Sequence, residues 1–151
     1  MLGKKKENSC YTYFSIRGDF DPEVVTSMLE LNPYKSWKSI DKRPNGTEYG
    51  FACWDYGRCE EYDVETENQM MKTIADLIPK INVLNQIKEK FDVEFYLEVV
   101  PKIYSKNASP CLGANLDIID FCHRTRTIID SAFSTQCLLQ FLEYVQDTCL
   151  N

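Results

Sequence analysis

The chain has 151 residues, a net charge of −6, and a composition that is 44% hydrophobic and 26% charged. This length suits one domain that buries roughly 68–70% of its unfolded surface, and the composition excludes collagen-like, low-complexity and fully disordered chains. The acidic charge argues against nucleic-acid binding, which needs clustered Lys and Arg for phosphate contacts.

The first predicted element is a strand over Tyr11–Ile16, rich in aromatic and β-branched residues, after a disordered segment at residues 1–9. The strand stops at Gly18. A helix follows, because Asp21 can cap it and Pro22 suits the first helical position. Its predicted buried stripe consists of Val24, Val25, Met28, Leu29 and Leu31.

A hairpin is predicted next. A polar strand over Lys35–Ile40 and a returning strand over Tyr49–Tyr56 flank the pair Asn45-Gly46. Both residues of this pair tolerate a positive φ, which a tight hairpin turn requires. Together these segments predict the order β–α–β–β.

A longer helical stretch comes after the hairpin, and Asp63 can cap it. Pro79 stands in its middle, where it removes a backbone hydrogen bond, so we expect a kink or two helices that break before Pro79. The apolar residues that recur at helical spacing are Met70, Met71, Ile74, Leu77, Ile78, Ile81, Leu84 and Ile87.

The clearest predicted strand is Val93–Val100, where apolar residues alternate with Glu94, Tyr96 and Glu98. A polar loop over residues 101–113 leads to a helix that Asn115 can cap. The predicted buried side of this helix consists of Leu116, Ile119, Phe121 and Cys122, and a final strand is expected over Thr127–Phe133.

The last segment, residues 134–151, predicts an amphipathic helix, because apolar residues recur at i, i+3, i+4, i+7 and i+11. Two positions are open for it. It packs over an exposed face of its own sheet, or it presents its apolar side to a second copy and makes a homodimer. The residues of this stripe are Leu138, Phe141, Leu142, Val145 and Cys149.

The order of elements predicts an α+β fold. Two β–α–β-like halves, joined by the long helix, would form a mixed or antiparallel sheet covered by helices on one face. We expect a single domain over residues 10–133, with the C-terminal helix added to it.

Three segments resemble a bacterial family, domain-of-unknown-function family 4279. They are Tyr11–Gly18 followed by Asp21-Pro22-Glu23, Trp54–Arg58 followed by a long helix, and Leu116–Phe121 before Thr127–Asp130. The resemblance covers about residues 10–130. It implies a small, soluble, mostly stand-alone bacterial protein and no established activity. From Ser131 on the chain departs from the family, whose members tend to finish in an alternating acidic and apolar strand.

The seven cysteines are an odd number, scattered among apolar neighbours, and no export signal precedes them. We therefore expect reduced thiols in a cytoplasmic protein. No close pairs with zinc-ligand spacing occur, and the adjacent Cys122 and His123 would point about 100° apart on a helix. Neither a metal site nor a cofactor is predicted.

A catalytic motif is also missing from the sequence, which has no nucleophile elbow and no phosphate-binding glycine loop. The alternative is a small enzyme that uses the sole histidine, His123, with a carboxylate or thiol in a cleft near Trp54 and Arg58. Glu94 and Glu98 share one face of their strand. That face is either solvated or a contact surface, or the two glutamates act as a catalytic pair.

The most suggestive surface combines aromatic and charged residues of the types that dominate binding hot spots. The alternative is that alternate residues such as Trp54 and Tyr56 pack under helices. We predict a non-enzymatic module that binds another protein, of an immunity or adaptor type, and neither nucleic acid nor membrane. The candidate binding residues are Trp37, Trp54, Asp55, Tyr56, Arg58 and Tyr62.

Overall fold

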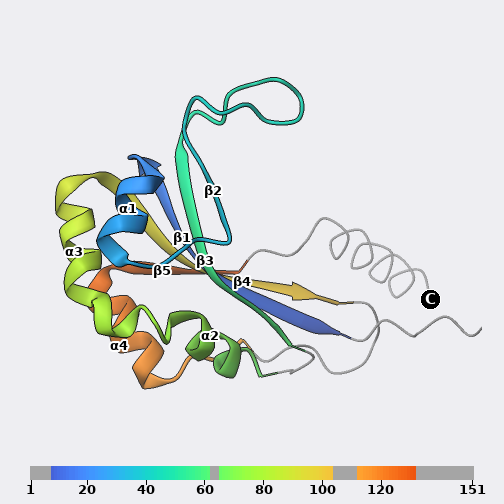
Figure 1. Cartoon of the computed structure of the whole chain (residues 1–151). Coiled ribbons are helices and arrows are strands. Elements are labelled where there is room, and N and C mark those ends of the chain that lie inside the picture. Colours follow the sequence, from blue (N-terminus) through green and yellow to red (C-terminus); the bar gives the residue numbers. More distant parts are fainter. Residues whose placement is uncertain (1–7, 62–64, 104–111, 132–151) are drawn as a thin grey trace, which may run out of the picture.

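A five-stranded mixed sheet forms the frame of the computed structural model, which describes residues 8–61, 65–103 and 112–131 (Figure 1). The strands are β1 (Ser9–Asp19), β2 (Lys35–Trp37), β3 (Ala52–Glu61), β4 (Asp92–Lys102) and β5 (Thr127–Ser131). Their order across the sheet is β2-β3-β1-β4-β5. β1 pairs antiparallel with both β3 and β4, whereas β5 pairs parallel with β4.

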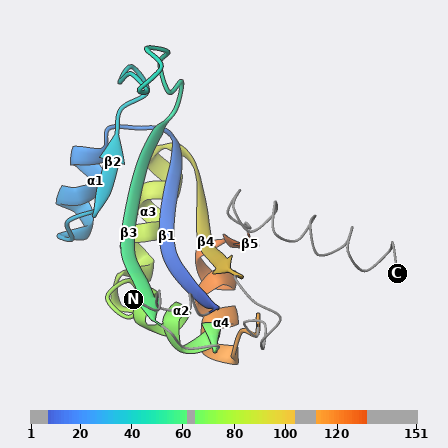
Figure 2. The same cartoon turned by 90° about the vertical axis from the view of Figure 1, so that its right-hand side faces the viewer.

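Four α-helices cover one face of this sheet, and Figure 2 shows them behind the strands. They are α1 (Pro22–Leu29), α2 (Thr66–Ile74), α3 (Ile81–Lys90) and α4 (Leu116–Thr125), with a 3-10 turn η1 (Ile78–Lys80) before α3. The predicted α+β fold with helices on one face is therefore confirmed. None of the helices in the described ranges is long and apolar enough to cross a membrane.

The helix boundaries follow local sequence signals. Asp21 accepts a hydrogen bond from the Glu23 amide at 3.0 Å, and Asn115 accepts one from the Ile118 amide at 3.0 Å, so both predicted caps are confirmed. The predicted break before Pro79 is also confirmed, since α2 ends at Ile74 and α3 begins at Ile81. The N-cap of α2 is Glu65, and Asp63 lies outside the described residues.

The core lies between the sheet and the helices, because alternate residues of the strands point toward the helical layer. The largest buried side chains come from β1, β3, β4 and the helices α1 to α4. They are Trp54, Phe14, Phe95, Phe121, Ile16, Leu29, Met70, Ile74, Leu77, Leu84, Ile87 and Leu97.

The predicted buried side of α4 is wrong in two positions, because Leu116 is 81% exposed and Ile119 is 49% exposed. The buried stripe starts instead at Ile118 and continues with Phe121, Cys122 and Thr125. These residues follow the spacing i, i+3, i+4 and i+7, which is one face of a helix. Leu116 is the first helical residue after the cap and projects away from the sheet.

Several strand ends also differ from the prediction. β2 ends at Trp37 rather than Ile40, and β3 begins at Ala52 rather than Tyr49. The intervening hairpin is held mainly by turn hydrogen bonds and one isolated bridge between Lys42 and Glu48. β4 runs on through Pro101 to Lys102, and residues 132–151, with the predicted C-terminal helix, lie outside the described residues.

Gly57 was predicted to end the returning strand, but β3 continues through it to Glu61. The register shifts here, because Thr12 pairs with Cys59 whereas Phe14 pairs with Tyr56. Two residues of β3 therefore oppose one residue of β1, which defines a β-bulge with glycine at a positive φ of 67°. Downstream of the bulge, each residue of β3 faces the side opposite to the one that simple alternation predicts.

Replacing Gly57 by alanine is expected to destabilise the fold by about 2–3 kcal/mol, from the positive φ and from crowding of the backbone. A Cβ atom at Gly57 would lie 2.6 Å from the carbonyl oxygen of Thr73. Gly46→Ala is the matched control, because Gly46 has a φ of 86° but nothing within 4 Å of its Cβ position. Urea denaturation of both variants measures the difference, and equal losses would contradict the crowding.

Candidate functional site

The sheet face opposite the helices, which we call the open face, carries polar and aromatic side chains. It arises because residues that alternate with the core positions point away from the helical layer. Its polar and aromatic residues include Tyr11, Tyr13, Ser15 and Arg17 of β1, Lys35 and Trp37 of β2, Cys53, Asp55, Arg58 and Glu60 of β3, Tyr96, Glu98 and Lys102 of β4, and Asp130 of β5. The same register places Glu94, Val100 and Ile128 on this face as well.

A buried ion pair between Arg17 and Glu98 lies at the centre of the open face. The Arg17 Nη2 donates to Glu98 Oε1 at 2.7 Å, and Arg17 Nε donates to Ser15 Oγ at 3.1 Å. The guanidinium also stacks over the Tyr96 ring, 4.8 Å from its centroid. Glu98 is only 3% exposed, while the Arg17 side chain is 32% exposed. Arg17 therefore supplies the charge compensation that the buried Glu98 carboxylate requires.

The pKa of Glu98 is raised by its burial, and Arg17 opposes this rise. Burial would lower the pKa of Arg17, but the charge and hydrogen bond of Glu98, together with smaller influences of Tyr13 and Cys53, outweigh it, so the pKa of Arg17 is raised. Arg17 consequently stays cationic at physiological pH.

Beside the ion pair, Cys53 links Ser15 to Asp55. The Cys53 thiol donates to Asp55 Oδ1 at 3.1 Å, and its sulfur lies 3.7 Å from Ser15 Oγ. Burial, followed by the charge of Asp55, raises the pKa of Cys53 to about 12. Cys53 is therefore a neutral thiol at physiological pH, whereas a nucleophilic cysteine needs a lowered pKa.

Tyrosine rings surround these polar groups. Tyr13 stacks on Tyr11 with centroids 6.1 Å apart, and it meets Tyr34 edge to face at 6.0 Å. Burial raises the pKa of both Tyr13 and Tyr34, and Asp55 adds to each rise. Their hydroxyl groups are therefore neutral, and the rings present apolar bodies with polar ends.

A second charged group occupies the end of the open face. Arg58 and Lys102 both lie over the Tyr11 ring, at 4.2 and 5.1 Å from its centroid, and both form ion pairs with Glu60. The hydrogen bond from Lys102 is the main cause that lowers the pKa of Glu60. Aromatic rings and paired charges thus alternate across β3, β1 and β4.

The residues predicted as a binding surface fall on both sides of the sheet. Asp55 and Arg58 are on the open face, whereas Trp54 is fully buried on the helical side and donates from Nε1 to Thr26 at 3.0 Å. Tyr56 stacks on Trp54 at 5.4 Å and donates to Asp76 at 2.6 Å. Trp37 stacks on Tyr49 of the hairpin at 4.4 Å, and Tyr62 lies outside the described residues. Because of the bulge at Gly57, Tyr56 and Arg58 lie on opposite faces of the sheet.

His123 does not join Asp55 and Arg58. It is exposed on α4, in the helical layer, across the sheet from the open face. The two glutamates of β4 are also kept apart in their contacts, since Glu94 pairs with Lys88 and Glu98 with Arg17. Among the described residues, no group of three or more His, Cys, Asp and Glu is placed to hold a metal ion.

Arg17, Ser15 and Tyr13 were missed as site residues by sequence reasoning. Their signal was the alternation along β1, which gives one face of the strand a run of polar and aromatic side chains. The sequence indicates that Glu94 and Glu98 share one face of β4, but it does not indicate which strand pairs with β4. Opposite charges on two alternating strands were the available clue to the ion pair.

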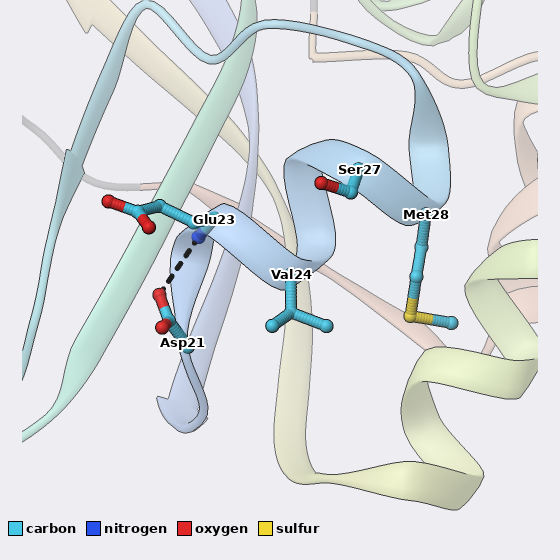
Figure 3. A pocket seen from close by; sticks show the side chains of 5 residues that line it. All are labelled: Asp21, Glu23, Val24, Ser27 and Met28. Atoms are coloured by element: carbon cyan, nitrogen blue, oxygen red, sulfur yellow. Dashed lines mark hydrogen bonds between the residues drawn. The ribbon is translucent and has the colours of Figure 1, made fainter.

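Two hollows of the described surface lie away from Arg17 and Glu98. One, of about 360 Å³, is lined by Asp21, Glu23, Val24, Ser27 and Met28 on the outside of α1 (Figure 3). Its most polar group, Asp21, caps the helix by the hydrogen bond drawn there. The other, of about 310 Å³, is lined by Lys88, Phe91, Asp92, Val93, Glu94 and Arg126. Neither hollow includes Arg17, Asp55, Glu98 or Asp130 of the open face.

The described residues define an α+β protein with one mixed sheet, whose open face carries polar and aromatic side chains. The family profile "Domain of unknown function (DUF4279)" matches residues 8–130, so the chain belongs to this family, as the resemblance predicted. No curated protein and no solved structure matches the chain.

Proposed function

We propose that this protein is a protein-binding module and that its open face receives the partner. The observation that carries the proposal is the composition of this face, where Tyr96 lies against the buried Arg17–Glu98 pair, Tyr11 and Tyr13 stack on the same strand, and Trp37 lies on β2. Tyr, Trp and Arg are the residues most enriched in binding hot spots. The four described helices all pack on the other face of the sheet (Figure 2).

The charge of the chain supports a basic partner. The net charge is −6, and the carboxylates of Asp55, Glu98 and Asp130 adjoin the guanidinium of Arg17 at the centre of the open face. The other cations of this face lie away from its centre, Lys35 on the edge strand β2 and Arg58 and Lys102 over Tyr11. Complementary charge speeds encounter and suppresses wrong partners. A module of this kind suits an immunity or adaptor role, in which it covers a basic surface of another protein.

The geometry gives less support to the enzyme alternative. That reading needs His123 beside a carboxylate or thiol, and His123 is exposed on the opposite side of the sheet from Asp55 and Cys53. The raised pKa values of Cys53, about 12, and of Cys10 and Cys122, about 11, arise chiefly from burial and disfavour thiolate chemistry.

Affinity capture from the native host tests the proposal. We expect the tagged wild-type chain to retain a stoichiometric basic protein, and Tyr34→Ala/Arg58→Ala to retain at least about tenfold less of it, as expected for hot-spot residues. Both residues are exposed on the open face, so the fold should tolerate the change. His123→Ala is the matched control on the helical layer and should capture as much as the wild type.

Two outcomes would contradict the proposal. One is the absence of any stoichiometric partner at low salt. The other is a partner that is lost with His123→Ala and kept with the open-face variant, since it would transfer the function to the helical layer.

A further inference from the structure

Within the part of the chain that the structure describes, the buried Asp55 carboxylate has no cationic partner. Asp55 is 5% exposed, and none of the ion pairs among the described residues includes it. Its side chain accepts a hydrogen bond from the Cys53 thiol at 3.1 Å, and a thiol is a weak donor. Burying a charge costs free energy unless the charge is paired, so a cation beside this carboxylate would be stabilising.

The nearby cationic side chains of the described residues interact with other groups. Arg17 is bound to Glu98 and Ser15, and Arg58 is bound to Glu60. Lys35 stands opposite Asp55 in the register of β2 and β3, but its Nζ lies over the Trp37 ring, 5.0 Å from the centroid. The place beside the Asp55 carboxylate is therefore not filled by a described Lys or Arg.

Two tyrosine rings accompany this carboxylate. Tyr34 donates its backbone amide to the Asp55 carbonyl oxygen at 2.9 Å, which holds Tyr34 against β3. Its ring meets Tyr13 edge to face, and the charge of Asp55 contributes to the raised pKa of each tyrosine. A carboxylate beside aromatic rings is the combination that attracts ammonium and guanidinium groups, through charge-assisted hydrogen bonds and cation–π contact.

We propose that Asp55 receives a cationic side chain, Lys or Arg, of the partner protein, which inserts beside the rings of Tyr13 and Tyr34. The inference rests on the proposed function and adds the chemistry of the contact. The side chain approaches past Tyr34, which is 44% exposed and precedes the β2 neighbour of Asp55, because the buried Ser15 of β1 lies on the other side of Asp55 in the sheet. Asp55 thus becomes the anchor of the interface, and its charge is neutralised on binding.

The test is a titration followed by amide NMR shifts, with n-propylammonium and n-propylguanidinium chloride as probes of the two side-chain types. We expect saturable shifts at Tyr34, Cys53 and Asp55. Neutral n-propanol and sodium chloride at equal ionic strength should give none. Asp55→Asn keeps the shape of the side chain and should weaken probe binding about tenfold or more, as expected for a charge-assisted hydrogen bond.

Asp117→Asn is the matched control, because Asp117 is an exposed carboxylate on α4, in the helical layer, and it should change the affinity less than about twofold. If Asp55→Asn fails to fold, Tyr34→Leu provides the second variant, since it removes an exposed ring and should also weaken binding. Equal binding by the wild type, Asp55→Asn and Tyr34→Leu would overturn the inference. Binding that appears only in Lys35→Gln would overturn it as well, because Lys35 would then occupy the site.

Failure of this inference is distinguishable from failure of the proposed function. If Asp55→Asn captures the partner protein as well as the wild type, while Tyr34→Ala/Arg58→Ala does not, the open face binds the partner without Asp55. In that case the anchor is overturned and the binding module stands.

Discussion

Arg17→Met is expected to lower the free energy of unfolding by about 3 kcal/mol, because it leaves the Glu98 carboxylate buried without its cation. Glu98 is almost fully enclosed, and Arg17 is its ion-pair partner at 2.7 Å. Urea denaturation followed by circular dichroism gives the value. A loss below about 1 kcal/mol, the range of exposed ion pairs, would mean that water reaches Glu98 freely.

Two control variants separate charge from packing. Glu98→Gln keeps the size of the side chain and an oxygen that can accept from Arg17, so its loss should be smaller than that of Arg17→Met. The double variant Arg17→Met/Glu98→Leu replaces the whole pair by apolar groups and should recover most of the stability, because no buried charge remains. If the double variant is as unstable as the single one, the loss arises from packing.

The loss from Arg17→Met should also depend on pH. Burial raises the pKa of Glu98, and removal of Arg17 takes away the main influence that lowers it. An acid with a higher pKa in the folded state than in the unfolded state binds more protons when folded, so stability falls as the pH rises through that interval. We therefore expect the largest loss at neutral pH and a smaller one near pH ~4, around the ordinary glutamate pKa.

Trp54→Ala is expected to destabilise the fold by about 3–5 kcal/mol, the range for truncating a large buried aromatic residue. Trp54 is fully buried, stacks on Tyr56 and donates to Thr26 of α1. Its removal leaves a cavity under α1 and an unpaired Thr26 hydroxyl. Thermal and urea unfolding measure the loss.

Trp37→Ala is the matched control for Trp54→Ala. Trp37 is only half-buried and packs on the hairpin residues Tyr49 and Phe51, so its loss should be clearly smaller. If Trp54→Ala unfolds like the wild type but no longer binds the partner, Trp54 is a contact residue and not part of the core.

The parts of the fold that were predicted correctly depend on local signals. Asp21 and Asn115 cap helices through bonds to residues two or three positions away, and Pro79 breaks a helix by its own ring. The alternation along Val93–Val100 likewise marks its buried side without reference to other strands.

The rest of the site depends on contacts between distant segments. Nothing near Arg17 in sequence identifies Glu98, because their contact requires the β1–β4 pairing. The side on which Arg58 lies depends on one extra residue at Gly57, and simple alternation places it with Trp54 and Tyr56. In α4, several apolar residues compete for the buried side, and packing against the sheet selects Ile118 over Ile119.

The middle place of β1 in the sheet has a consequence for biosynthesis. β1 is the first described strand to leave the ribosome, but its neighbours β3 and β4 are translated later. Gly18, for example, can pair with Val93 only after Val93 has been translated. Such pairing between distant segments closes a long loop, which costs entropy and slows folding. The aromatic strand therefore emerges with both hydrogen-bonding edges unpaired, and unpaired strand edges make an incompletely folded chain prone to aggregation until β4 has been translated.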